Sequence, residues 1–65
     1  MDKNKIAENL KTLRGEMSVA DLSVRLGVGA SAIYMYEAGE RVPNDEVKIK
    51  YAKVFNKSVD EIFFQ

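Results

Sequence analysis

The chain offers few side chains that could carry out covalent chemistry. It has no histidine and no cysteine, so it lacks the imidazole that most often acts as a base near neutral pH and the thiolates that serve as nucleophiles or metal ligands. Its ten acidic residues are scattered, several of them where helices are expected to begin. No pairing of a nucleophile with a base is apparent. The sequence therefore predicts no enzyme, no cofactor and no metal site.

The residues that could make noncovalent contacts with a large partner gather in one stretch, LGVGASAIYMYEAGERVP, from Leu26 to Pro43. The glycines of the turn before it and the Gly-to-Pro segment after it favour a short helix over about Ala30–Glu37. This helix has no Arg, Lys, Asn or Gln, so its side chains offer no amide or guanidinium groups. At helical spacing one side holds Ile33 and Tyr36, and the more open side holds Ala30, Ser31, Tyr34 and Met35.

Further helices must position this stretch. Apolar residues recur three and four positions apart through the rest of the chain, and no strand pattern is present. Two Ser-x-x-acid patterns, Ser18 to Asp21 and Ser58 to Glu61, are typical of capping boxes, in which the serine oxygen accepts from the backbone and the carboxylate reaches back. The expected helices run over about Asn4–Arg14, from the Ser18 cap to Leu26, over about Ala30–Glu37, from the Asn44 cap through Phe55, and from the Ser58 cap through Phe63.

Length and charge set the remaining limits. Sixty-five residues suffice for one small core, so we expect one domain over residues 1–65, an all-α, compact five-helix bundle. Ten basic and ten acidic residues give a formal net charge of zero, so the broad positive field of a nonspecific nucleic-acid binder is missing. The N-terminus has no apolar leader segment and the longest apolar runs are short. The protein is expected to be soluble and cytoplasmic, without a membrane partner.

The segment MSVADLSVRLGVGASAIYMYEAGERVP, together with the tail AKVFNKSVDEIFF, resembles the Cro/repressor-type regulators of the XRE family over nearly the whole chain. This resemblance implies the lambda-repressor-like DNA-binding domain with its helix-turn-helix. It also implies that the third helix lies in the major groove of DNA, while the start of the second helix and the loop after the third contact phosphates. Backbone N–H groups at a helix N-terminus suit a phosphate oxygen whatever the side chains are.

Carried over by position, the resemblance gives a set of DNA-contacting residues. The expected groove contacts are Gly29, Ala30, Ser31, Tyr34 and Met35, the expected phosphate contacts are Ser18, Val19 and Arg41, and Lys48, near the start of the fourth helix, is a further cation that could reach DNA. Arg14 is the weakest candidate for a phosphate contact. Tyr34 and Met35 could instead pack beside each other, and Arg41 could be an ordinary solvated cation.

Several positions depart from the family pattern. Val19 stands where many relatives have Gln, and Ala30 where a long polar or basic side chain is common. Specificity is therefore expected from Ser31, from apolar contact with thymine methyls and from DNA shape. Glu37 would repel DNA unless it turns inward to bond a backbone group or an arginine, so we expect it to be structural and to hold the loop.

The predicted function is a sequence-specific DNA-binding transcriptional regulator, a repressor that binds a double-stranded DNA operator as a homodimer. Phe63 and Phe64 are adjacent and cannot both enter one core, so one is expected to face outward as a candidate dimer contact. The zero net charge and the helix without basic groups leave an alternative open. In that alternative, the chain is a protein-binding helix-turn-helix module that antagonises or tethers another regulator, with a protein as partner.

Overall fold

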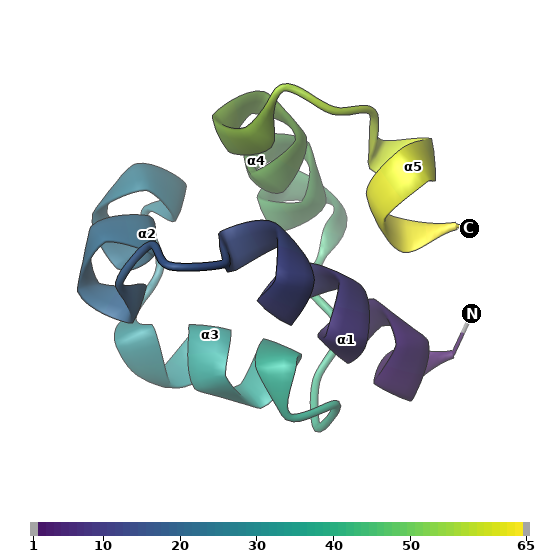
Figure 1. Ribbon diagram of the computed structural model, residues 1–65, viewed down its shortest axis with the longest axis horizontal. Coiled ribbons are helices and arrows are strands. Elements are labelled where there is room, and N and C mark those ends of the chain that lie inside the picture. The colour runs from purple at the N-terminus through teal and green to yellow at the C-terminus, as the bar shows by residue number, and fades with distance from the viewer. Residues whose placement is uncertain (1, 65) are drawn as a thin grey trace.

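The computed structural model describes residues 2–64, which fold into five α-helices joined by short turns (Figure 1). The helices are α1 (Lys3–Arg14), α2 (Val19–Leu26), α3 (Ala30–Glu37), α4 (Asp45–Phe55) and α5 (Val59–Phe63). No strand occurs within this described part, so the all-α prediction is confirmed and each expected helix is present. None of the helices among residues 2–64 is long and apolar enough to cross a membrane.

Side-chain caps fix where the helices begin. The Ser18 Oγ accepts a hydrogen bond from the backbone N–H of Asp21, at 3.0 Å, and the Ser58 Oγ accepts one from Glu61, also at 3.0 Å. Only the second cap is a complete capping box, because the Glu61 carboxylate also accepts from the Ser58 N–H. The predicted reciprocal bond from Asp21 is absent. An aspartate side chain is one methylene shorter than the glutamate or glutamine of a capping box, which accounts for the difference.

The core lies between α1, α4 and the pair α2–α3, with α5 closing it from the side of α1 and α4 (Figure 1). Tyr51 of α4 is fully buried at its centre, and its ring lies 6.4 Å from that of Tyr36 and 6.0 Å from that of Phe63, both edge to face. Such aromatic pairs add to the stabilisation from burial alone. The buried hydrophobic residues of the core are Ile6, Ala7, Leu10, Leu22, Leu26, Ile33, Tyr36, Val47, Tyr51, Ile62 and Phe63.

Two aromatic residues near the C-terminal end differ from Tyr51. Phe55, which the sequence pattern places in the core, is only partly buried, and its ring stacks on that of Tyr51 at 6.3 Å. Phe63 is buried and Phe64 is 56% exposed. The expectation that one of the two adjacent phenylalanines faces outward is confirmed.

The turn after α3 is braced by the first turn of α1. Gly39 has a φ of 75°, a left-handed conformation that favours glycine. A Cβ at this position would lie 2.8 Å from the Asn4 Oδ1. The backbone conformation therefore favours glycine here, and the turn lies close to the first turn of α1.

Candidate nucleic-acid interface

The pair α2–α3 is joined by a tight turn of three residues. Gly27 ends α2 in the left-handed conformation, with a φ of 72°. The Ser23 hydroxyl donates to the Val28 carbonyl, and this bond ties the turn back onto α2. Leu26 and Ile33 are fully buried on the inner sides of the two helices. In Figure 1 the two helices run in clearly different directions, as expected for so short a connection.

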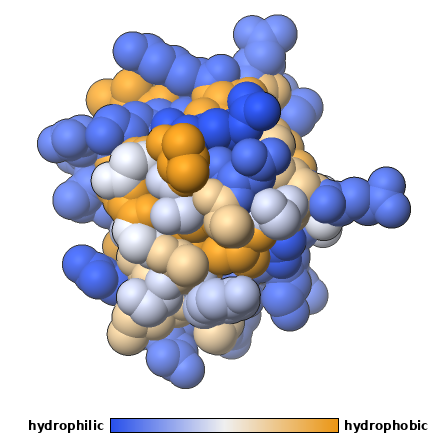
Figure 2. Space-filling model, turned by 90° about the vertical axis from the view of Figure 1, so that its left-hand side faces the viewer, coloured by the Kyte–Doolittle hydropathy of each residue, from blue (hydrophilic) through white to orange (hydrophobic). Residues whose placement is uncertain are grey.

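The predicted groove residues share one exposed face. We call Gly29, Ala30, Ser31, Tyr34 and Met35 the α3 outer surface. All five are exposed, Tyr34 by 60% and Met35 by 40%. None of them carries a charge. Figure 2 looks at the side of the molecule that carries α2 and the start of α3. Its lower half is pale and light orange, while hydrophilic side chains project around the rim.

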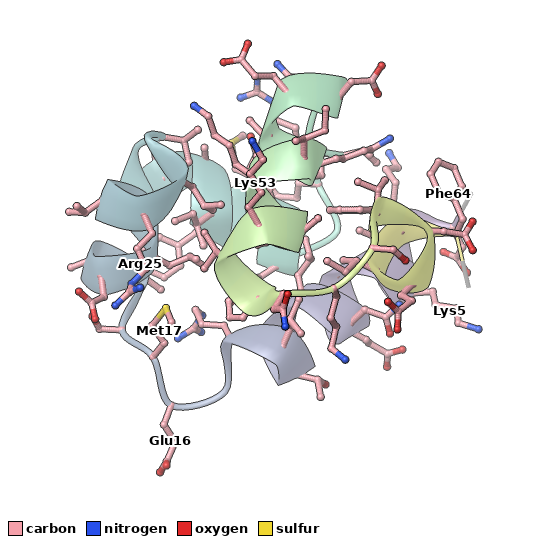
Figure 3. The ribbon with its side chains drawn as sticks, turned by 90° about the horizontal axis from the view of Figure 1, so that it is seen from above. Lys5, Glu16, Met17, Arg25, Lys53 and Phe64 are labelled. Atoms are coloured by element: carbon pink, nitrogen blue, oxygen red, sulfur yellow. The ribbon has the colours of Figure 1, made fainter. Side chains whose placement is uncertain are left out.

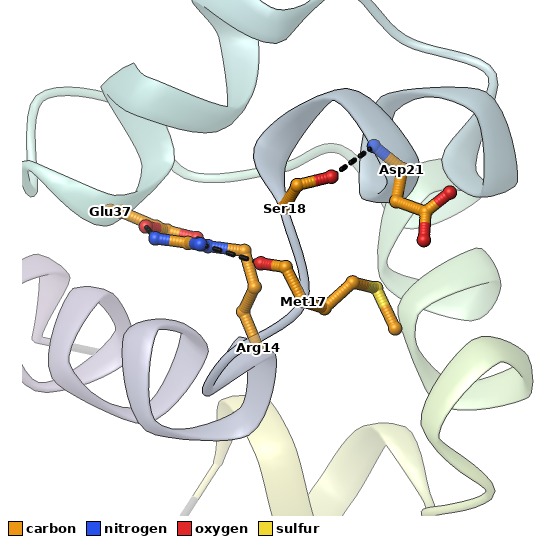
Figure 4. Close-up of polar contacts among 5 residues, drawn as sticks. All are labelled: Arg14, Met17, Ser18, Asp21 and Glu37. Atoms are coloured by element: carbon orange, nitrogen blue, oxygen red, sulfur yellow. Dashed lines mark hydrogen bonds and ion pairs between the residues drawn. The ribbon is translucent and has the colours of Figure 1, made fainter.

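The C-terminal end of α3 is held by an ion pair with α1. Glu37 is 6% exposed, and its carboxylate accepts two hydrogen bonds from Arg14, from Nε at 2.7 Å and from Nη2 at 2.9 Å. The remaining Arg14 nitrogen, Nη1, donates to the Met17 carbonyl at 2.8 Å (Figure 4). The hydrogen bonds to Glu37 raise the pKa of Arg14. One guanidinium thus joins the end of α3 to the connection between α1 and α2.

This ion pair bears on the predictions for Glu37 and for Arg14. Glu37 turns inward onto an arginine, as expected, although the loop that the pair holds is the one between α1 and α2 and not the one after α3. Arg14 uses three of its five N–H donors within the protein, so its first role is to join α1 to Glu37 and Met17. The arrangement also keeps the carboxylate away from the α3 outer surface. An arginine–carboxylate fork of this kind fixes orientation as well as adding energy.

The predicted phosphate contacts have three different settings. Ser18 is exposed and its hydroxyl is used as the cap of α2, whereas Val19 is half-buried and packs against the core. Arg41 is exposed in the loop between α3 and α4, where Pro43 is buried. Arg25, which the sequence reasoning did not select, is exposed on α2 and is labelled in Figure 3. Its position near the end of α2 gives no sequence signal that its side chain is exposed.

Three acidic residues lie in or next to α2 and α3 in the sequence. Glu16 precedes α2 and points away from the molecule (Figure 3), Asp21 is in the first turn of α2, and Glu40 adjoins Arg41; all three are exposed. With the exposed Arg25 and Arg41, the charged residues of this part of the sequence are of both signs.

Lys48 is not a freely solvated cation. Its side chain is only 11% exposed, and its Nζ lies 5.7 Å from the ring centroid of Phe63 and 5.3 Å from that of Phe64. The Asp45 carboxylate is 3.9 Å from the same nitrogen. The lysine therefore covers the aromatic end of α5, because a long alkyl stem can pack on apolar groups while its ammonium meets ring faces. Sequence spacing alone carries no signal for this contact.

The turn between α2 and α3 and the exposed face of α3 define a helix-turn-helix of the kind that DNA-binding proteins use. The helix-turn-helix family HTH_3 matches residues 6–62. The chain belongs to this family, and the resemblance to Cro/repressor-type proteins of the XRE class is confirmed. It is a DNA-binding regulator of the XRE type. Neither a curated protein nor a solved structure matches the chain.

Proposed function

We propose that residues 1–65 act as one domain, a sequence-specific repressor of transcription that places α3 in the major groove of an operator. The observation that carries this proposal is the division of α3 into two faces. Glu37 and Ile33 are held inside, while every residue of the α3 outer surface is exposed. Its small residues, Ala30 and Ser31, stand in the first turn and permit close approach to base edges.

Phosphate contacts at the start of α2 would come from the backbone. The Ser18 cap uses the N–H of Asp21, and the Ser18 carbonyl accepts from Leu22. The N–H groups of Val19 and Ala20 have no acceptor within residues 2–64. Two unpaired N–H groups at the positive end of the helix dipole suit a phosphate oxygen. Arg41 supplies a side-chain cation from the loop after α3.

Repression and dimerisation follow from the modest contact set. A protein that occupies an operator overlapping a promoter blocks transcription without a separate activating surface. One short helix without bidentate base contacts binds a half-site weakly, so useful affinity needs two copies across a two-fold site. We place the homodimer contact at Val59–Phe64, where Phe64 is exposed. Sedimentation should then give two chains per operator, and one chain per operator would rule out this contact.

The direct test is selection of binding sites from a random DNA pool with the purified chain. We expect an enriched motif with two-fold symmetry. Ala30→Trp should abolish binding to that motif, because the bulky ring lifts α3 from the bases, while the circular dichroism spectrum stays unchanged. Ile49→Trp is the matched control, since Ile49 is 49% exposed on α4, outside the proposed interface. Loss of binding in both variants would contradict the proposal.

A second candidate function is a protein-binding module that antagonises or tethers another regulator. The observation that favours it is the exposed α3 outer surface, which carries no charged group that could attract phosphates. The two functions give different results in the same experiment. If no motif is enriched, and if Ala30→Trp and Ser31→Ala leave DNA affinity unchanged, the protein-binding function is the better account.

A further inference from the structure

The α3 outer surface offers very few groups that can hydrogen-bond to a base. Only two of its side chains have a donor or an acceptor in the ordinary sense, the hydroxyls of Ser31 and Tyr34. The one carboxylate of α3, that of Glu37, is engaged by Arg14 through two bonds and is buried. The described part of α3 therefore has no fork that could pair with guanine or adenine.

Apolar contact is what this surface can offer. Met35 is 40% exposed, Tyr34 presents a ring that is 60% exposed, and the Ala30 methyl is exposed one turn earlier. Ala30 and Tyr34 are four residues apart, as are Ser31 and Met35, so each pair lies on one line along the helix. Two short parallel rows thus run along the exposed side, each with a small residue first and a large residue after it.

The floor of the major groove has one apolar feature to match these rows. The base edges show hydrogen-bond donors and acceptors, and only thymine adds an apolar group, its C5 methyl. A methyl group at C5 of cytosine occupies the same place in the groove. A surface of methyl, thioether and aromatic groups gains little from a guanine O6 but gains burial from such a methyl. The chemistry therefore distinguishes a pyrimidine with a C5 methyl from one without.

We infer that the α3 outer surface recognises C5-methylated pyrimidines, thymine or 5-methylcytosine, in each half-site, and that Met35 is the residue that covers one of these methyls. This inference rests on the proposed function, because it presupposes that α3 lies in the groove. It names the chemistry of the bases that α3 reads. Met35 determines specificity through a contact with a carbon atom and forms no hydrogen bond to the base.

The test uses the motif enriched from the random pool and single replacements of thymine by deoxyuridine, which removes only the methyl. At each contacted thymine we expect about fourfold weaker binding, the factor for one buried methyl-sized group. Replacing the same T·A pair by a C·G pair and by a 5-methylcytosine·G pair gives a second comparison. The methylated cytosine should bind about fourfold more tightly than the unmethylated one, the same methyl-sized factor.

A variant links the effect to one side chain. In Met35→Ala the deoxyuridine penalty should disappear at one position of the half-site and persist at the others. Ile49→Ala removes an apolar residue of similar exposure from α4 and should leave every penalty intact. Circular dichroism checks that both variants fold, and the deoxyuridine series on the parent chain tests methyl recognition independently of either variant.

Methyl recognition, the role of Met35 and the proposed function would be contradicted by different results. If a motif is enriched but every deoxyuridine replacement is neutral, methyl recognition is wrong and the proposed regulator function stands. If deoxyuridine weakens binding but Met35→Ala leaves the whole pattern unchanged, the assignment of Met35 is wrong. If no motif is enriched, the proposed function itself is wrong, and the inference is overturned with it.

Discussion

The two faces of α3 are built on opposite principles. The inner face is fixed by a buried isoleucine, a buried tyrosine and a carboxylate held by two hydrogen bonds from Arg14. The outer face carries five exposed, uncharged residues. Eight residues of helix thus contain most of what orients the motif and most of what could meet DNA. Side chains that stabilise the fold and side chains that could bind DNA point in different directions from the same helix. A substitution should therefore affect either stability or DNA binding.

The largest expected contrast is between Ile33→Ala and Met35→Ala. Ile33 is fully buried, so its truncation should cost roughly 3–5 kcal/mol, through lost burial and the cavity left behind. That is about the whole stability of a domain of this size. Met35 is 40% exposed, and its truncation should cost well under about 1 kcal/mol. Urea titrations of both variants measure the difference in the free energy of unfolding. Equal losses of stability would show that the two faces do not differ in this way.

The next contrast concerns the ion pair that anchors the inner face. Arg14→Met leaves the Glu37 carboxylate, 6% exposed, without its partner, and should cost about 3 kcal/mol. Adding Glu37→Leu removes the stranded charge and should restore much of the lost stability, because apolar pairs often replace buried ion pairs at little cost. A double-mutant cycle by denaturant unfolding gives the coupling. A single variant as stable as the parent would mean that the pair does not anchor α3.

A smaller effect is expected on the outer face, and in binding only. Ser31→Ala should weaken binding by about 1–3 kcal/mol at one base position, the scale of one lost base contact. The melting temperature should not change, because Ser31 is exposed and its side chain makes no hydrogen bond within residues 2–64. Titrations against single-base variants of the selected motif test this. A uniform loss over all variants would point to a phosphate contact instead.

The smallest expected effect is the difference in stability between the Ser18 cap and the Ser58 cap. Asp21 and Glu61 occupy the same position, three residues after a capping serine, but only Glu61 accepts from the serine N–H. Glu61→Ala should therefore lower the melting temperature more than Asp21→Ala does. The hydrogen bonds from the Ser58 backbone and side chain lower the pKa of Glu61 below its ordinary 4.5. Its contribution is present above that pH and is lost as pH falls through the lower, folded-state value.

The pH series supplies the control for that comparison. At neutral pH the two alanine variants should melt at different temperatures, and in acid their difference should shrink as Glu61 becomes protonated. Thermal melts followed by circular dichroism between pH 7 and about pH 3 cover the range in which a glutamate titrates. A difference that stays constant across this range would mean that the reciprocal bond is not what separates the caps.

The sequence predicts the helices because their ends carry local signals. Ser18, Asn44 and Ser58 accept the N–H bonds expected of caps, and Gly15 and Gly27 end α1 and α2. The outward face of α3 follows from helical spacing, which places Ser31 opposite Ile33 and turns Tyr34 about 100° away from it. These features depend on residues a few positions apart. Periodicity and capping therefore suffice for them.

The errors arise where the partner is distant in sequence. Glu37 is expected to find an arginine, but only the packing of α1 on α3 shows that it is Arg14, 23 positions away. From the sequence, Lys48 looks like a solvated cation. Its burial cannot be predicted, because it depends on where α5 places Phe63 and Phe64. Phe55 fits the apolar spacing of its helix, yet it lies at the margin of the core. Spacing gives the direction of a side chain but not what covers it.

The position of α5 has a consequence for how the protein is made. Ile62 and Phe63 are each 3% exposed, and the Asn9 side chain of α1 donates to the Ile62 carbonyl at 3.3 Å. α1 is synthesised first but cannot complete its packing until α5 is available. The core therefore stays open until residue 63 has emerged from the exit tunnel. The residues of α3 are synthesised before the fold that exposes their outer side is complete. Folding, and with it DNA binding, should begin only after the nascent chain has passed that residue, so stalled shorter chains would be substrates for proteases rather than weak regulators.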